Sequence, residues 1–185
     1  MKTEVLTLNK ERNVTLTTYI QDCGEGFGCV AKRPAVLILP GGAYQMCSDR
    51  EADPVAFAFA KAGYHAFVLR YSVMDDCTWP NPLNDYEQAM TLIRSHADTW
   101  HIYEDKIAVI GFSAGGHLAS TIATHAKPEL RPNFQILFYP VITMDKSYTH
   151  RGSHDNLLGK DASAELELEY SNAVSYTHLR AHETR

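Results

Sequence analysis

Residues 107–116 read IAVIGFSAGG, and this stretch decides the fold that we expect. Its first four residues are apolar, which is typical of a strand that is buried on both faces of a sheet. The turn Gly111-Phe112-Ser113-Ala114-Gly115 follows, and residues 114–126 have the pattern of a helix. A serine in a G-x-S-x-G turn between a strand and a helix is the pattern of a nucleophile elbow. We therefore predict that Ser113 is a catalytic nucleophile.

The alternative interpretation of this turn is a glycine-rich connection with an incidental serine. The setting favours the nucleophile, because the N-terminus of the following helix would place free N–H groups and positive dipole beside a developing negative charge. The flanking glycines would let neighbouring backbone pass close to the turn.

The rest of the chain predicts strand–helix alternation. Four apolar runs predict buried strands, at residues 35–39, 65–71, 107–110 and 134–139. Three segments predict helices, at residues 53–62, 85–97 and 114–126. Residues 5–8 and 14–19 alternate between apolar and polar side chains, which predicts a hairpin. This order indicates an α/β domain with a mostly parallel sheet, helices on both faces and an antiparallel N-terminal hairpin.

A second motif, Leu39-Pro40-Gly41-Gly42-Ala43-Tyr44, follows the first of the buried strands. Acyl transfer produces an oxyanion, and two aimed backbone N–H groups can stabilise it. We predict that the N–H of Ala114 is one donor of this oxyanion hole and that the N–H of Gly42 or Ala43 is the other. Taken alone, the motif could equally be a tight turn after a strand.

The composition excludes several classes of partner. The chain has 185 residues, 45% of them hydrophobic, and a net charge of −5, which favours one globular domain and argues against a nucleic-acid partner. No apolar run approaches the roughly 20 residues that cross a membrane, so we expect no membrane partner. The N-terminus lacks the apolar segment of a secretory signal, so we expect a cytoplasmic protein.

The cysteines Cys23, Cys29, Cys47 and Cys77 form no C-x-x-C pair, and no histidines accompany them at zinc spacing. We expect reduced thiols, no metal site and no organic cofactor.

Three runs carry a resemblance to a known family: PGGAY at residues 40–44, SDREADPVAFAFAKAGYHAFVLRYSV at 48–73 and GFSAGGHLAS at 111–120. They resemble bacterial α/β-hydrolases of the esterase/lipase group, in particular acetyl esterases and acetylxylan-esterase-like proteins. The resemblance covers about residues 1–172 and departs from the family's third glycine at Ala43. It implies an α/β-hydrolase fold and hydrolysis of small acyl esters, acetyl esters first among them and some of them on carbohydrates, through an acyl-enzyme on Ser113.

Other residues near the motifs have less certain roles. His117 lies one helical turn beyond Ser113, where a general base is poorly placed, so we expect it to be structural. The resemblance suggests that Arg50, Glu51 and Asp53 orient the oxyanion loop, whereas acidic residues at a helix start are equally a solvated first turn. Tyr44 is expected to bind substrate in the acyl pocket. Trp79 is a weaker candidate for that pocket, since aromatic side chains more often belong to the core.

A serine esterase also needs an acid and a base, which follow the nucleophile in the order Asp or Glu, then His. The resemblance places both after strands that we do not find in this sequence, so we expect the C-terminal strands to be missing and the triad to be incomplete. An alternative uses Asp145 as the acid and His150 or His154 as the base.

Residues 174–185, VSYTHLRAHETR, have no apolar period and resemble translated adapter sequence. We therefore divide the chain into a partial hydrolase domain at 1–173 and an artefactual tail at 174–185, and we do not recruit His178 or His182 as the base.

These observations predict a serine carboxylic-ester hydrolase whose turnover, in the chain as written, is absent or strongly impaired. Two rivals remain. One is a serine peptidase of the oligopeptidase type, although those enzymes usually add a large N-terminal domain. The other is a non-catalytic binding module, because a fold does not determine a function.

Overall fold

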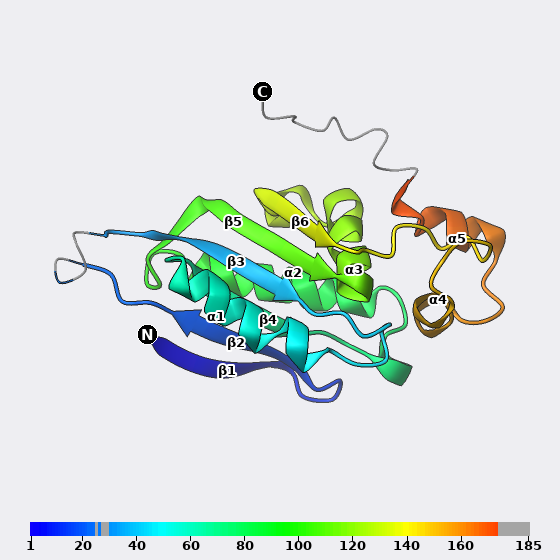
Figure 1. Cartoon of the computed structure of the whole chain (residues 1–185), viewed down its shortest axis with the longest axis horizontal. Helices are drawn as coiled ribbons and strands as arrows, with labels where there is room; N and C mark the ends of the chain where they lie inside the picture. Colours follow the sequence, from blue (N-terminus) through cyan, green and yellow to red (C-terminus); the bar gives the residue numbers. More distant parts are fainter. Residues whose placement is uncertain (25, 27–29, 174–185) are drawn as a thin grey trace, which may run out of the picture.

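The computed structural model describes residues 1–24, 26 and 30–173, and its centre is a six-stranded sheet in the order β1-β2-β4-β3-β5-β6 (Figure 1). The strands are β1 (Lys2–Asn9), β2 (Val14–Ile20), β3 (Arg33–Leu39), β4 (His65–Arg70), β5 (Ile102–Phe112) and β6 (Phe134–Phe138). The α-helices are α1 (Asp53–Lys61), α2 (Asn81–Ser95), α3 (Ser113–His125), α4 (Arg151–Leu158) and α5 (Ala164–Glu169). Short 3-10 helices are η2 (Asp49–Glu51), η3 (Met74–Asp76) and η4 (Pro128–Leu130).

The pairing of the strands confirms the expected fold class. β4, β3, β5 and β6 run parallel to one another, whereas β1 pairs antiparallel with β2, and β2 pairs antiparallel with β4. The hairpin therefore extends one edge of a parallel sheet, as its alternating sequence predicts. The register aligns Leu39 of β3 with Gly111 of β5, and Phe112 with Phe138 of β6. The ends of three neighbouring strands thus meet around the turn that follows β5.

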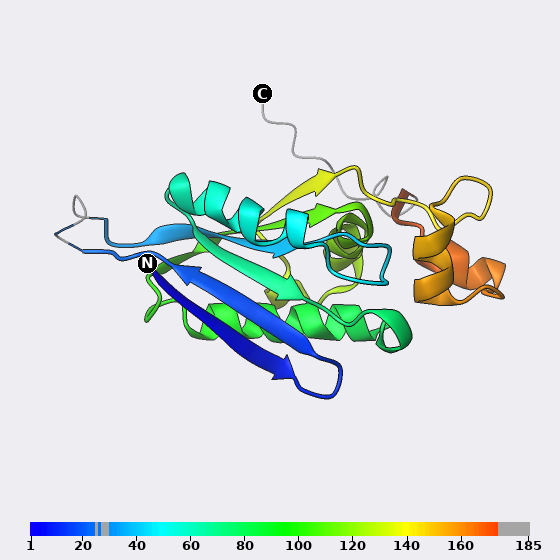
Figure 2. The same ribbon diagram turned by 60° about the horizontal axis from the view of Figure 1, so that its bottom comes forward.

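Helices cover both faces of the sheet, with α1 on one side and α2 on the other (Figure 2). β3 shows why both faces of the sheet are covered: its alternate side chains point to opposite faces and pack in two separate apolar clusters. Leu37 and Leu39 pack in the larger cluster with the apolar residues of α2 and α3, whereas Val36 and Ile38 pack in a smaller cluster under α1. A strand that is apolar on both faces is therefore explained by a helical layer on each side.

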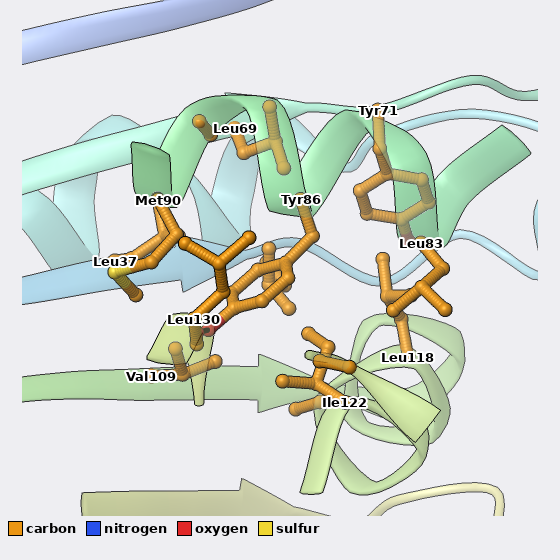
Figure 3. Close-up of a cluster of buried hydrophobic side chains, with 14 of the residues drawn as sticks. Leu37, Leu69, Tyr71, Leu83, Tyr86, Met90, Val109, Leu118, Ile122 and Leu130 are labelled. Atoms are coloured by element: carbon orange, nitrogen blue, oxygen red, sulfur yellow. Dashed lines mark hydrogen bonds between the residues drawn. The ribbon is translucent and has the colours of Figure 1, made fainter. Parts of the chain in front are cut away.

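Figure 3 shows the larger cluster, to which Tyr86 and Met90 of α2 and Leu118 and Ile122 of α3 belong, with Met90 beside Leu37 of β3. Tyr86 is fully buried, and its hydroxyl donates a hydrogen bond of 2.6 Å to the carbonyl oxygen of Leu130. The one polar atom of this side chain is thus paired inside an apolar layer, which removes the cost of burying it.

Two expectations about strands need correction. β5 begins at Ile102 rather than 107, because residues 103–106 are exposed and mostly charged and so interrupt the apolar run. β6 was expected to be buried, but Phe134, Ile136 and Phe138 are 61%, 39% and 43% exposed. Among the described residues β6 has a partner on one side alone, so it is an edge strand.

The helices agree more closely with expectation. α2 begins at Asn81, four residues before the expected start, because Pro82 is tolerated in a first helical turn. Ser163 caps α5 by accepting a hydrogen bond from the N–H of Leu166. α4 and α5 lie together beyond the ends to which the β3, β5 and β6 arrows point (Figure 1).

Candidate active site

The turn between β5 and α3 holds Ser113 in an unusual backbone conformation. Phe112 is extended, with φ −114° and ψ 131°, and the helix begins at the next residue, Ser113, whose φ is +50°. A positive φ on a residue other than glycine is uncommon and costs of the order of 1–3 kcal/mol, and it concentrates at functional sites. The strand–turn–helix context that the G-x-S-x-G pattern requires is therefore present.

Two glycines of the motif allow backbones to cross at contact distance. A Cβ on Gly111 would lie 2.3 Å from the carbonyl oxygen of Gly115. A Cβ on Gly115 would lie 2.2 Å from the carbonyl oxygen of Leu39, at the end of β3. Both distances are far below contact range, so neither position accepts a side chain without moving backbone.

The second motif lies directly against the first. A Cβ on Gly41 would lie 2.8 Å from the carbonyl oxygen of Phe112 and 3.0 Å from Cβ of Ser113. Residues 40–44, which we call the glycine loop, therefore form one wall of the space around Ser113. The parallel register of β3 and β5 produces this neighbourhood, because it brings the two strand ends to the same edge of the sheet.

Five consecutive carbonyl groups of the glycine loop accept hydrogen bonds from fixed donors. The carbonyl of Pro40 accepts the Tyr71 hydroxyl at 2.6 Å, and that of Gly41 accepts the Ser48 N–H at 2.8 Å. The carbonyl of Gly42 accepts the N–H groups of Gln45 and Met46 at 2.9 and 3.2 Å. The carbonyl of Ala43 accepts Nδ2 of Asn156, and that of Tyr44 accepts the Met74 N–H, both at 2.8 Å. Each peptide plane of the loop is thereby held in one orientation.

The N–H groups of the glycine loop differ in whether a hydrogen-bond acceptor takes them. Gly41 donates its N–H to Oε2 of Glu51 at 2.8 Å. In the described part of the chain, no acceptor takes the N–H of Gly42 or of Ala43. Gly42 has φ +133° and Ala43 has φ +56°, and these left-handed conformations turn the loop back on itself. Both of the N–H groups considered for the loop's contribution are therefore available, and the oxyanion hole of Ala114 with Gly42 or Ala43 stays a prediction.

Of the three acidic and basic residues considered for this loop, the structure brings Glu51 to it. Asp53 instead accepts a hydrogen bond of 2.7 Å from the Tyr19 hydroxyl and lies 3.7 Å from a guanidinium nitrogen of Arg70. Arg50 is exposed. The sequence could not separate the three residues, because only the path of η2 decides which side chain faces the loop.

His117 has a structural role, as expected. The Tyr44 hydroxyl donates to Nδ1 of His117 at 2.8 Å, and Nε2 of His117 donates to the carbonyl oxygen of Tyr170 at 2.9 Å. Burial lowers the pKa of His117 to about 4. Both ring nitrogens are occupied and the imidazole is neutral, so His117 cannot take a proton from Ser113.

The same hydrogen bond places the side chain of Tyr44, which was expected to bind substrate, in the core. Tyr44 is fully buried, and its ring packs edge-on against Tyr71 and His117. Its backbone belongs to the glycine loop, but its side chain belongs to the core. Trp79 likewise packs against Tyr170, with ring centroids 4.5 Å apart.

A cavity of about 420 Å³ opens at Ser113. Its other lining residues come from the segment after β6 and from the N-terminal side of α4: Tyr139, Pro140, Val141, Ile142, Thr143, Tyr148, Thr149 and His150. The N–H of Val141 donates to the carbonyl oxygen of Ser113 at 3.1 Å, which fastens this second wall to the turn.

The alternative acid and bases do not form a triad with Ser113. The Asp145 carboxylate accepts the N–H of Ser147, and His154 is buried between Asp155 and Glu167. His150 lines the cavity, but its Nδ1 accepts the N–H of Ser153. Within the described residues no histidine is hydrogen-bonded to the Ser113 hydroxyl, and His178 and His182 lie outside those residues.

Among the described residues, no group of three or more His, Cys, Asp or Glu side chains is placed to hold a metal ion. None of the helices described combines the length and the apolar character that a membrane span requires.

The parallel sheet, the strained serine turn after β5 and the glycine loop after β3 together define the α/β-hydrolase fold. Solved structures agree. MGS-M1, an α/β hydrolase from a Medee basin deep-sea metagenome library, is 39% identical and superimposes with a TM-score of 0.76 over 96% of this chain and 78% of its own. An acetyl ester-xyloside bifunctional hydrolase from Caldicellulosiruptor lactoaceticus is 30% identical, with a TM-score of 0.79 over 92% of this chain and 68% of its own.

The family is identified by the sequence. The BD-FAE family model matches residues 29–176, which is most of the chain, and the chain belongs to that family. An acetylxylan esterase from Xylanibacter ruminicola is 41% identical over 151 residues, a match that covers 78% of this chain and 31% of the relative. The chain thus spans about a third of the length of that relative.

Proposed function

We propose that the protein is a serine carboxylic-ester hydrolase in which Ser113 is the nucleophile. The observation that carries the proposal is the positive φ of Ser113 directly beside a glycine loop with two N–H groups that have no acceptor among the described residues. A strained serine, a preorganised pair of donors and an adjoining cavity are the parts that acyl transfer requires.

The reaction would proceed through an acyl-enzyme. Oγ of Ser113 forms a bond to the ester carbonyl carbon, and its proton passes to a base. The carbonyl oxygen becomes an oxyanion, which the N–H of Ala114 and that of Gly42 or Ala43 stabilise. The bond to the alcohol oxygen then breaks, the alcohol leaves with the proton, and water hydrolyses the acyl-serine by the same steps in reverse order.

The proposed substrates are small acyl esters, with acetyl esters of carbohydrates as the favoured group. The support is the likeness to an acetylxylan esterase and to an acetyl ester-xyloside bifunctional hydrolase, together with the modest volume of the Ser113 cavity. No nucleic acid, membrane or cofactor enters the proposal.

The acid and the base of the triad are proposed to lie outside residues 1–173, the partial hydrolase domain, and residues 174–185 are proposed to contribute neither. The 185-residue chain should then turn over substrate poorly, because loss of one triad member reduces turnover by about 10⁴- to 10⁶-fold. A cytoplasmic location is also proposed, and the free thiols of Cys23, Cys47 and Cys77 support it.

The test compares p-nitrophenyl acetate hydrolysis by the 185-residue chain with that of Ser113→Ala and of a matched control, Ser95→Ala, on the exposed side of α2. Slow hydrolysis that Ser113→Ala abolishes and Ser95→Ala retains is expected. Hydrolysis that is indifferent to Ser113→Ala would exclude the proposed nucleophile, and rapid Ser113-dependent turnover would overturn the incomplete triad.

Two further measurements separate the rival functions. Faster cleavage of an aminoacyl amide than of p-nitrophenyl acetate would favour the peptidase. No covalent labelling of Ser113 by a fluorophosphonate, even with a long reaction time, would favour the binding module.

A further inference from the structure

The Glu51 carboxylate accepts two hydrogen bonds that connect the glycine loop to Tyr139, a residue that lines the Ser113 cavity. Its Oε2 accepts the N–H of Gly41, in the glycine loop, at 2.8 Å. Its Oε1 accepts the hydroxyl of Tyr139, the residue after β6, at 2.7 Å. These distances are those of charge-assisted hydrogen bonds, which are about twice as strong as neutral ones.

Both partners lie directly beside Ser113. Gly41 has the close approach to Cβ of Ser113 described above, and Tyr139 lines the same cavity. Tyr139 is 64% exposed and has φ +35°, a left-handed conformation that a tyrosine adopts at a cost. Its ring also lies 5.9 Å from that of Phe112, centroid to centroid. An exposed side chain on strained backbone needs an anchor, and the Glu51 carboxylate supplies one.

We propose that Glu51 is a positioning residue, which fixes the glycine loop and Tyr139 relative to each other and so holds both of them in place beside Ser113. The inference rests on the proposed function for its consequence in catalysis, but the connection itself is a property of the folded chain. The competing view is that Glu51 is a solvated acidic residue at a helix start, with no effect on the loop.

The position of the charge supports a role in selecting the oxyanion donors. By taking the N–H of Gly41, Glu51 occupies that donor, whereas the N–H groups of Gly42 and Ala43 have no acceptor among the described residues. Two neutral donors, the Gly41 N–H and the Tyr139 hydroxyl, hold the Glu51 carboxylate in one orientation. The hydrogen bond to Glu51 is the main cause that raises the pKa of Tyr139.

The connection is tested by NMR on the 185-residue chain, without reference to activity. Glu51→Gln and Glu51→Ala are compared with Glu11→Gln, a matched control in the turn of the N-terminal hairpin. We expect both Glu51 variants to return the Tyr139 pKa toward its ordinary value. Glu51→Ala should also speed amide exchange at Gly41 by about 10-fold or more and shift the amide resonances of Gly42 and Ala43. An unchanged Tyr139 pKa together with an unchanged Gly41 amide would overturn the proposal.

The consequence for catalysis is tested by single-turnover acylation with p-nitrophenyl acetate. We expect Glu51→Ala to slow acylation of Ser113 by about 10- to 100-fold with little change in the half-saturating ester concentration, because misplaced donors lose transition-state contacts rather than ground-state binding. Tyr139→Phe, which keeps the Gly41 bond, should have a smaller effect, and Glu51→Gln should recover part of the rate. A rate equal to that of the unmodified chain would exclude the positioning role.

The two proposals fail in different ways. If Ser113→Ala does not change the reaction of the unmodified chain, the proposed nucleophile is wrong, and the NMR comparison alone decides whether Glu51 connects the glycine loop to Tyr139. If Ser113 reacts and the Glu51 variants react equally well, the proposed function stands and the positioning role is excluded.

Discussion

The Tyr44 hydroxyl donates a hydrogen bond to Nδ1 of His117 at 2.8 Å, and this bond joins the glycine loop to the helix that Ser113 begins. Neither group reaches solvent, since both residues are fully buried. His117 in turn donates to the backbone of Tyr170, next to α5, so one neutral imidazole connects three parts of the chain. Its charge state therefore bears on the stability of the whole active-site region.

Stability should fall as the pH is lowered from about 6.5 to about 4. Burial lowers the pKa of His117, and also that of His65, to about 4, whereas both histidines would have the ordinary pKa of 6.5 in the unfolded chain. The unfolded state then binds more protons across this window, so acid favours unfolding, and the stabilisation is fully present only above it. At about 1.4 kcal/mol per pKa unit, each histidine contributes about 3 kcal/mol to the difference.

The measurement is urea denaturation at pH 4.5 and 7.5. His117→Gln should reduce the difference in unfolding free energy between the two pH values by an amount of that order. His96→Gln is the control, because His96 stacks on Trp100 at the end of α2 and has no such burial. If the unfolding free energy changes equally between the two pH values in the unmodified chain and in His117→Gln, His117 does not stay neutral in the folded protein.

Asp85→Asn should destabilise the chain by about 3–5 kcal/mol. Asp85 is fully buried in α2, where one carboxylate oxygen contacts Arg12 at 2.6 Å and the other accepts the N–H and hydroxyl of Ser72. Removing the charge leaves Arg12 partly buried without its partner, which is the costly way to break such a pair. Asp98→Asn, at an exposed pair with Lys32, should cost less than about 1 kcal/mol. Equal losses in urea denaturation would contradict this difference.

Gly42→Ala should disrupt the glycine loop. Gly42 has φ +133°, and a Cβ there would lie 2.2 Å from the carbonyl oxygen of Met46. We expect a fall in melting temperature of several degrees and a loss of Ser113 acylation by at least about 100-fold, because the N–H groups of the loop would be turned away. Gly26→Ala is the matched control, since a Cβ there meets nothing within 4 Å. Acylation by Gly42→Ala at the unmodified rate would argue against the loop as the oxyanion hole.

Phe134→Lys should reduce self-association of the chain. Phe134 is 61% exposed on the edge strand β6 and borders an apolar cavity of about 510 Å³ between β6 and α1. Exposed apolar side chains on an unpaired strand edge promote association between chains, and a lysine there opposes it. Sedimentation at increasing concentration measures the effect. Phe57→Lys on α1, at a phenylalanine that is 52% exposed, should have less influence. An association that persists unchanged in Phe134→Lys would place the contact elsewhere.

Much of the fold follows from the sequence, because its main determinants are local. The apolar runs of β3, β4 and β5 and the patterns of α1 and α3 are each visible within a dozen residues, and the order of strands and helices restricts the topology. The serine turn was likewise predictable, since its glycines and flanking elements are consecutive.

The site was less predictable, because its contacts join distant segments. Tyr44 lies in a motif that suggested the cavity, but its side chain turns to His117, 73 residues further on. Glu51 meets Tyr139 across 88 residues, and no periodicity in either segment indicates the pair. The exposure of β6 also could not be inferred from its composition, since Phe134–Phe138 is as apolar as a central strand and only its neighbours decide its burial.

The hydrogen bond from Asn156 to the Ala43 carbonyl has a consequence for the order of assembly. The ribosome makes the glycine loop early, and it makes the serine turn, against which the loop packs, about 70 residues later. Asn156 belongs to α4, which leaves the ribosome last of the three. The hydrogen bond that holds the Ala43 carbonyl therefore forms only after both motifs have emerged. A nascent chain that ends before α4 contains both sequence motifs of a hydrolase but lacks this bond to the glycine loop.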